Sequence, residues 1–172
     1  MRSNIHRLTM AAMGLALVAI STSVFQFQIP LGYAHLGNCM ILLFAVYCDP
    51  WTGTFAGGIG SMLSDLLSYP QWALPTLIIK SLMGLLVSRI AKKPGQIPAL
   101  RAPRTLFGVL AGILTMVAGY FLGGSLLYGS FVTGAAQIPG LVAEGIVGIL
   151  LFYGIAAPLE AAGLTKYFRH GG

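Results

Sequence analysis

The sequence predicts an all-α integral membrane protein: one bundle of six transmembrane helices with both termini in the cytoplasm. Of its 172 residues, 56% are hydrophobic and only 8% are charged, whereas soluble domains carry about 25% charged residues. The apolar residues fall into six runs, and about 20 apolar residues suffice to cross the hydrocarbon core. Because six runs fill the chain, we interpret residues 1–172 as a single transmembrane domain.

The expected spans, in chain order, are Leu8–Phe27, Asn38–Cys48, Thr52–Ser68, Trp72–Ile90, Thr105–Leu127 and Ile138–Leu159. The first follows a basic segment that resembles a signal peptide, but we find no convincing cleavage site and keep it as a span. The second is short, so we expect it to be tilted, to extend into its flanks or to lie partly within the bundle.

The distribution of positive charge supports this order of spans, because Lys and Arg concentrate on the cytoplasmic side of a membrane. With six spans, one face receives Arg2, Arg7, Arg89, Lys92, Lys93, Arg101, Arg104, Lys166 and Arg169. The loops on the other face contain no charged residue. A basic excess arranged in this way indicates contact with anionic lipid, so we expect a lipid bilayer and no nucleic acid as partner.

The uncharged loops are rich in aromatic and neutral polar residues, among them Tyr33, His35, Trp72 and Tyr128. Such groups suit a small, flat ligand with little or no charge. The alternative for each aromatic residue alone is the interfacial belt found in most membrane proteins.

Apart from Arg89 at the end of the fourth span, three charged residues lie within the expected spans, where a charge at the centre costs at least about 2.5 kcal/mol. Asp65 and Lys80 differ in depth by about one turn, so they could pair, and Asp65 could equally contact a ligand. Glu144 has three possible companions, namely a ligand group, the Lys80 ammonium or a retained proton. We favour a ligand site for Glu144.

Small residues form a stripe on the first span, where Ala12, Ala16, Ala19 and Ser23 recur at spacings of four, three and four. Helices pack closely in lipid through such residues. The stripe is therefore either internal packing or a surface that docks a partner.

The sequence contains no phosphate-binding loop and no cluster of metal ligands, and its three histidines are scattered. We therefore expect no enzyme, no catalytic residue, no cofactor and no metal. An intramembrane hydrolase centred on Ser61 is a weak alternative, because no histidine base lies near this serine in the sequence.

Several motifs together resemble the substrate-binding S components of energy-coupling factor (ECF) vitamin transporters, in the riboflavin-transporter-like branch. The nearest likeness is to S components assigned to pyridoxine or hydroxymethylpyrimidine. The motifs are FQFQIPLGYAHLGN at 25–38, DPWTG at 49–53, GGIGS at 57–61, DLL at 65–67, PTLIIK at 75–80, IP at 138–139 and EGIVG at 144–148.

The resemblance implies a six-helix subunit of the plasma membrane that binds a small vitamin with high affinity near its outer face. Its partners would be a transmembrane coupling subunit and two cytoplasmic ATPases, with Ala12 and Ala16 docking the coupling subunit. The residues that the resemblance assigns to substrate binding are Tyr33, His35, Trp72, Lys80, Tyr128 and Glu144.

Two positions depart from the family pattern. Asn38 stands where relatives carry an acid, and Glu144 stands where an amide is common. Exchanging an acid and an amide changes the hydrogen-bond partners that a site accepts, so the identity of the vitamin stays open. The functional alternative is a self-sufficient channel or secondary carrier, with Asp65, Lys80 and Glu144 forming an ion path.

Overall fold

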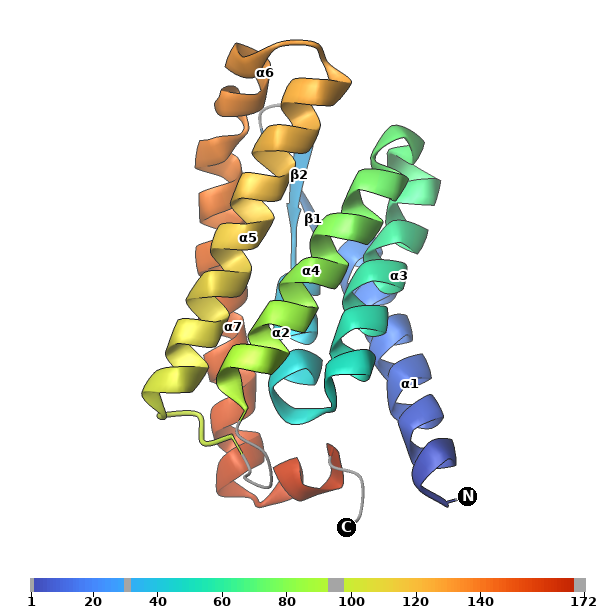
Figure 1. The fold of residues 1–172 in the computed structure, drawn as a ribbon, viewed down its shortest axis with the longest axis vertical. Helices are drawn as coiled ribbons and strands as arrows, with labels where there is room; N and C mark the ends of the chain where they lie inside the picture. Colours follow the sequence, from blue (N-terminus) through green and yellow to red (C-terminus); the bar gives the residue numbers. More distant parts are fainter. Residues whose placement is uncertain (1, 30–31, 93–97, 169–172) are drawn as a thin grey trace.

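The computed structural model describes residues 2–29, 32–92 and 98–168. Its six long helices are α1 (Arg2–Val24), α2 (Gly37–Tyr47), α3 (Pro50–Ser68), α4 (Ala73–Ala91), α5 (Pro103–Leu127) and α7 (Ile138–Ala161). The shorter elements are strands β1 (Gln26–Ile29) and β2 (Gly32–His35), helix α6 (Phe131–Ala136) and the 3₁₀ turns η1 (Pro70–Trp72) and η2 (Leu164–Phe168). The long helices form one bundle, and both chain termini lie at the same end of it (Figure 1).

Helix α2 occupies the centre of the bundle. Ten of its eleven residues are buried, and it packs against α1, α3, α4 and α7. A helix of this length is about 16 Å long, roughly half the thickness of the hydrocarbon core. Because a helix that is apolar on all sides is a buried helix, the short expected span Asn38–Cys48 lies within the bundle rather than against lipid.

Within the described residues, four helical segments are long and apolar enough to cross a membrane: Asn4–Val24, Pro70–Ala91, Pro103–Leu127 and Phe131–Ala161. Helix α3 has 19 residues but is less apolar, because glycines, serines and Asp65 interrupt it. The bundle of six helices was thus predicted correctly, although two of the six do not reach the length and hydropathy of a typical span.

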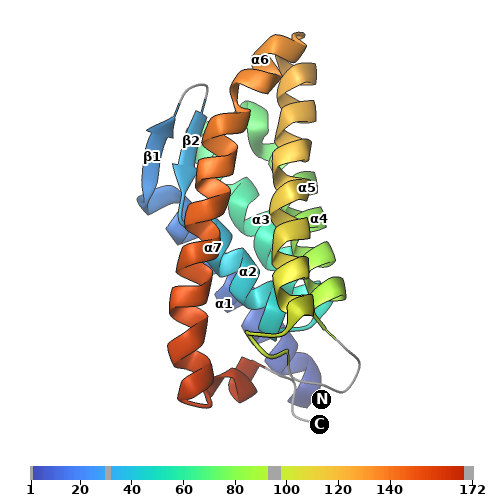
Figure 2. The ribbon, with the colours of Figure 1, turned by 90° about the vertical axis from the view of Figure 1, so that its left-hand side faces the viewer.

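The prediction was wrong where the expected first span, Leu8–Phe27, ends. Helix α1 stops at Val24, and an antiparallel hairpin follows in which Gln26 pairs with His35. The segment Gln-Phe-Gln-Ile alternates polar and apolar residues, which is the period of a strand, but the long apolar run before it obscured this pattern. The hairpin lies beside α7, with β2 between β1 and that helix (Figure 2).

Glycine allows the helices around α3 to pack closely. A Cβ atom at Gly84 of α4 would lie 2.5 Å from the carbonyl oxygen of Gly53, and one at Gly60 would lie 2.9 Å from that of Leu15 in α1. Any side chain at these positions would force the helices apart. Internal packing therefore explains the small residues of α3.

The described Lys and Arg side chains other than Lys80 belong to segments at the end of the bundle that carries the termini (Figure 1): Arg7, Arg89, Lys92, Arg101, Arg104 and Lys166. The side chains of Arg2, Lys93 and Arg169 lie outside the described residues. At this end Asp49 caps α3 by accepting hydrogen bonds from the backbone N–H groups of Trp51 and Thr52. The Arg7 Nη2 atom donates to the Asp49 carboxylate at 3.2 Å.

Candidate functional site

Lys80, Asn38 and Glu144 form a buried polar cluster where α4, α2 and α7 meet, and none is more than 3% exposed. The Lys80 Nζ atom donates to Asn38 Oδ1 at 2.6 Å and lies 3.4 Å from Glu144 Oε1. The Asn38 Nδ2 atom donates to the same Glu144 oxygen at 2.7 Å. Because one amide accepts from the cation and donates to the anion, Asn38 joins two charges that belong to different helices.

His35, the last residue of β2, joins this cluster. Its Nε2 atom lies 3.3 Å from Glu144 Oε1, and its Nδ1 atom accepts a hydrogen bond from the Gly37 backbone N–H at 3.1 Å. Since Nδ1 is an acceptor, the ring proton is on Nε2 and points to the carboxylate. The hairpin is thereby attached to α7 through the site itself.

The Lys80 ammonium has few strong hydrogen-bond acceptors. Besides Asn38 and Glu144 it lies 3.1 Å from the Met116 sulfur and 5.3 Å from the centre of the Tyr120 ring. A thioether is a weak acceptor, and an ammonium carries three N–H donors. An oxygen or nitrogen atom of a ligand would therefore be a better partner for Lys80 than Met116 is.

Aromatic side chains form a wall between this cluster and the end of the bundle opposite the termini. The Trp72 ring centre lies 5.5 Å from that of Tyr120 and 6.1 Å from that of Tyr128. Trp72 Nε1 donates to the Tyr128 hydroxyl at 3.3 Å, and the hydroxyls of Thr76 and Tyr120 are 2.9 Å apart. Trp72 ends η1, and Thr76 and Lys80 follow on α4 at intervals of four residues. The three side chains therefore lie on one face of this continuous helical segment.

Gln137 is a further polar residue near this wall. It is 5% exposed, and its Nε2 atom has no hydrogen-bond partner in the described part of the chain. It lies against Gly124 of α5, where a Cβ atom would overlap its amide. It precedes Glu144 by seven residues, about two helical turns, which is the same side of α7. A buried amide without a partner is a candidate ligand contact.

Of the residues that the resemblance assigns to substrate binding, the structure brings His35, Lys80 and Glu144 together. It also brings Trp72 and Tyr128 into contact with each other. The backbone of Tyr33 belongs to β2, but its side chain lies outside the described residues.

Sequence reasoning did not assign five residues of this region to the site: Asn38, Thr76, Met116, Tyr120 and Gln137. Met116 and Tyr120 are separated by four residues on α5, as Thr76 and Lys80 are on α4. Matching intervals on neighbouring spans are the signal that could have placed these side chains opposite one another.

Glu144 lies 3.4 Å from the Lys80 ammonium, which is one of the three companions considered for this carboxylate. Asp65, which is 4% exposed, also acts electrostatically on Lys80 from α3. Three helices therefore contribute acidic or basic groups to the same region of the bundle.

Ser61 does not have the surroundings of a nucleophile. It is 1% exposed, and its hydroxyl has no hydrogen-bond partner within the described residues. A catalytic serine needs a base within hydrogen-bond reach. We interpret Ser61 as a small residue of the α3 packing surface.

Ala12 and Ala16 lie on the outward face of α1. Both are exposed, whereas Val18 is fully buried and Gly14 packs near Phe44. The small-residue stripe is thus not part of the internal packing at these two positions.

Comparison with known proteins gives a family match over residues 2–161, to the ECF-type riboflavin transporter S component. A Pyrococcus woesei protein, described as an uncharacterized protein in a gap 3′ region, is 36% identical over 152 residues, which cover 83% of this chain and 99% of that protein. The thiamine precursor transporter HmpT of Lactococcus lactis subsp. cremoris (strain MG1363) is 29% identical over 176 residues, which cover 96% of this chain and 95% of that protein.

Proposed function

Because the chain belongs to the family of ECF-type riboflavin transporter S components, we propose that it binds pyridoxine or hydroxymethylpyrimidine at the buried cluster of Lys80, Asn38 and Glu144. The family consists of transporter subunits rather than enzymes, and the chain is a multi-pass membrane protein. We assign it to the plasma membrane, with both termini in the cytoplasm and the aromatic wall towards the outside, on the strength of its charge distribution.

The observation that carries this proposal is the position of a balanced ion pair beneath aromatic rings. A pyridine or pyrimidine ring stacks on Trp72, Tyr120 or Tyr128. Its ring nitrogen or a hydroxyl oxygen accepts from Lys80, while a hydroxyl group donates to Glu144. Lys80 and Glu144 compensate each other, so a ligand without net charge leaves this pair balanced.

The Lactococcus lactis relative supports the same class of ligand, since its name describes a transporter of a thiamine precursor. Hydroxymethylpyrimidine corresponds to the pyrimidine half of thiamine. For this chain we propose that transport depends on a transmembrane coupling subunit and two cytoplasmic ATPases, which supply the energy for transport.

Binding is tested by measuring thermal stabilisation of the purified chain in detergent against a panel of vitamins and precursors. A ligand at 100 times its dissociation constant should add about 2.7 kcal/mol to the free energy of unfolding. We expect pyridoxine or hydroxymethylpyrimidine to give this stabilisation. Tyr128→Ala should weaken it, because the ligand loses part of the aromatic wall, whereas Tyr167→Ala at the opposite end should leave it unchanged.

Stabilisation by neither compound, or equal stabilisation of both tyrosine variants, would contradict the proposed ligand or the proposed site. Gradient-driven uptake by the chain alone, without an ATPase, would instead support the carrier alternative.

Docking through α1 is tested by replacing Ala12 and Ala16 with leucine. The exposed surface at these positions becomes bulky while the site stays intact, so we expect co-purification with the coupling subunit to be lost and ligand binding to persist. Ala143→Leu makes the same change at an exposed position of α7 and should not affect assembly. Loss of ligand binding with assembly intact would show that the two alanines serve internal packing.

A further inference from the structure

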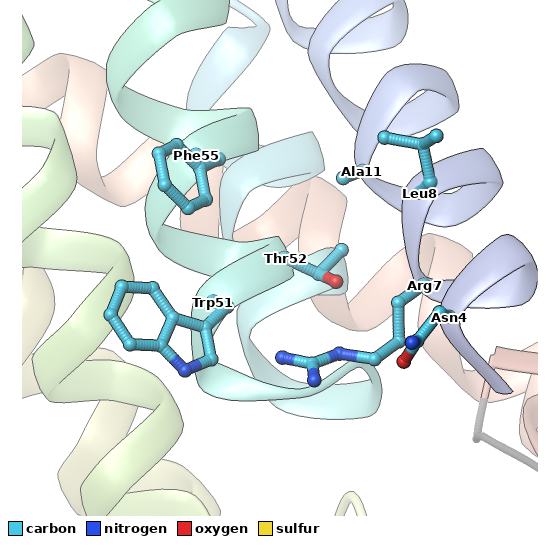
Figure 3. Close-up of a pocket in the computed structure, with 7 residues that line it drawn as sticks. All are labelled: Asn4, Arg7, Leu8, Ala11, Trp51, Thr52 and Phe55. Atoms are coloured by element: carbon cyan, nitrogen blue, oxygen red, sulfur yellow. The ribbon is translucent and has the colours of Figure 1, made fainter.

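A groove runs along the outside of the bundle between α1 and α3, near the end that carries the termini. It has a volume of about 340 Å³ and is open to the surroundings on one side. Asn4, Arg7, Leu8 and Ala11 line it from α1, and Trp51, Thr52 and Phe55 line it from α3 (Figure 3). The groove lies at the opposite end from the aromatic wall of the candidate site, so it is a separate feature.

The groove changes from polar to apolar along its length. Both helices run away from the termini, so residues later in each helix lie deeper in the bundle (Figure 1). Asn4 and Arg7 are at the shallow end, whereas Leu8, Ala11 and Phe55 follow further in (Figure 3). A phospholipid has the same order of groups, with a polar head at the membrane surface and an apolar chain below it.

Trp51 and Phe55 make one wall of the groove, and both side chains are exposed. Their side chains are 63% and 46% exposed, and their rings stack with centres 5.9 Å apart. Tryptophan is enriched at the level of the lipid headgroups, so its position fixes this part of the groove at the membrane surface.

The charge at the shallow end is suited to a phosphate group. Arg7 is 41% exposed and gives one N–H group to Asp49, while a guanidinium has five. Asp49 also accepts from Trp51 and Thr52, so its carboxylate is already occupied by the start of α3. The surrounding end of the bundle carries an excess of Lys and Arg, which attracts anionic lipid.

The groove thus offers a cation and polar groups near the membrane surface and apolar side chains below them. We propose that this groove binds one anionic phospholipid, with its phosphate at Arg7 and one acyl chain along Leu8, Ala11 and Phe55.

The chain has only two tryptophans, which makes the proposal directly testable by fluorescence. In the Trp72→Phe variant, Trp51 is the sole tryptophan. This variant is reconstituted in phosphatidylcholine vesicles that contain a small fraction of brominated phosphatidylglycerol or brominated phosphatidylcholine. We expect brominated phosphatidylglycerol to quench Trp51 as strongly as about five times the same amount of brominated phosphatidylcholine. One basic residue at a membrane surface attracts anionic lipid by about 1 kcal/mol, which corresponds to this factor.

Two variants and one control identify the site. Arg7→Gln should abolish the preference for the anionic lipid, and Ala11→Phe should reduce it by filling the groove while Arg7 remains. Lys166→Gln removes one exposed charge from the same end of the bundle without lining the groove, and should retain the preference. If Arg7→Gln fails to fold, Ala11→Phe still tests the proposal.

Equal quenching by the two brominated lipids would overturn the proposal, as would a preference that survives both groove variants. Variants that keep the lipid preference but no longer assemble with the coupling subunit would assign the groove to a protein partner and would also overturn it.

Discussion

Replacing Lys80 with methionine is expected to lower the free energy of unfolding by about 3–5 kcal/mol, because it leaves the buried Glu144 carboxylate without its cation. Lys80 is fully buried, and its ion pair with Glu144 spans 3.4 Å. Methionine fills most of the same space, so the lost charge dominates the effect. Denaturant unfolding of the ligand-free chain in detergent measures this difference.

The control for this prediction removes both charges. Lys80→Met combined with Glu144→Gln should recover most of the lost stability, since no unpaired charge remains. Lys166→Met, at an exposed position, should change stability by less than about 0.5 kcal/mol. If the double variant is as unstable as the single one, the ion pair does not explain the effect. A stable double variant that no longer binds ligand would separate the two roles of Lys80.

Exchanging the acid and the amide of the cluster should be far less harmful than making either change alone. In the folded chain the Asn38 amide donates to Glu144 at 2.7 Å. Asn38→Asp replaces this donor with a second carboxylate, so it should cost at least the roughly 1.5–3 kcal/mol that a hydrogen bond to a charged group contributes. Glu144→Gln leaves Lys80 without its anion, at a cost of about 3–5 kcal/mol. The combined variant again has one acid and one amide around Lys80, with side chains of unchanged size.

A double-mutant cycle on the unfolding free energies measures this coupling. We expect the combined variant to be more stable than the two single effects added together would predict, by at least about 2 kcal/mol. This is near the upper end of the interaction energies found for residues in one network. Additive effects would mean that Asn38 and Glu144 do not share Lys80 in the folded chain. Ligand specificity should change even where stability is restored, because the exchanged groups present different donors and acceptors.

The sequence predicted most of the fold because the physics of a membrane is restrictive. Long apolar runs have few alternatives to helices, and the positions of Lys and Arg fixed the order of the loops. The hairpin at Gln26–His35 escaped prediction because only four residues of alternating polarity follow the 17 residues of helical character, 8–24, with which the expected span Leu8–Phe27 begins. The central position of α2 also required the structure, since its apolar sequence fits either lipid or a protein interior.

The site was predicted less completely, for a physical reason. A charged residue in a span is conspicuous because it is costly, so Lys80 and Glu144 stood out. Their companions Met116 and Tyr120 are common in membrane helices and become informative only when the relative rotation of α4 and α5 is known. Asn38 was noted as a departure from the family pattern, but its bridge between two charges depends on how α2 lies between α4 and α7.

The hairpin has a consequence for electrical insulation. A pair of strands leaves the outer backbone edge of each strand without a partner strand, and hydrocarbon cannot satisfy exposed N–H and C=O groups. We therefore expect water to reach the protein backbone in the half of the bundle that holds β1 and β2. The other half of the bundle then forms the barrier of low dielectric constant. In that half, residues 41–46 of α2 are no more than 5% exposed. We accordingly expect the transmembrane voltage to fall across a layer thinner than the protein itself.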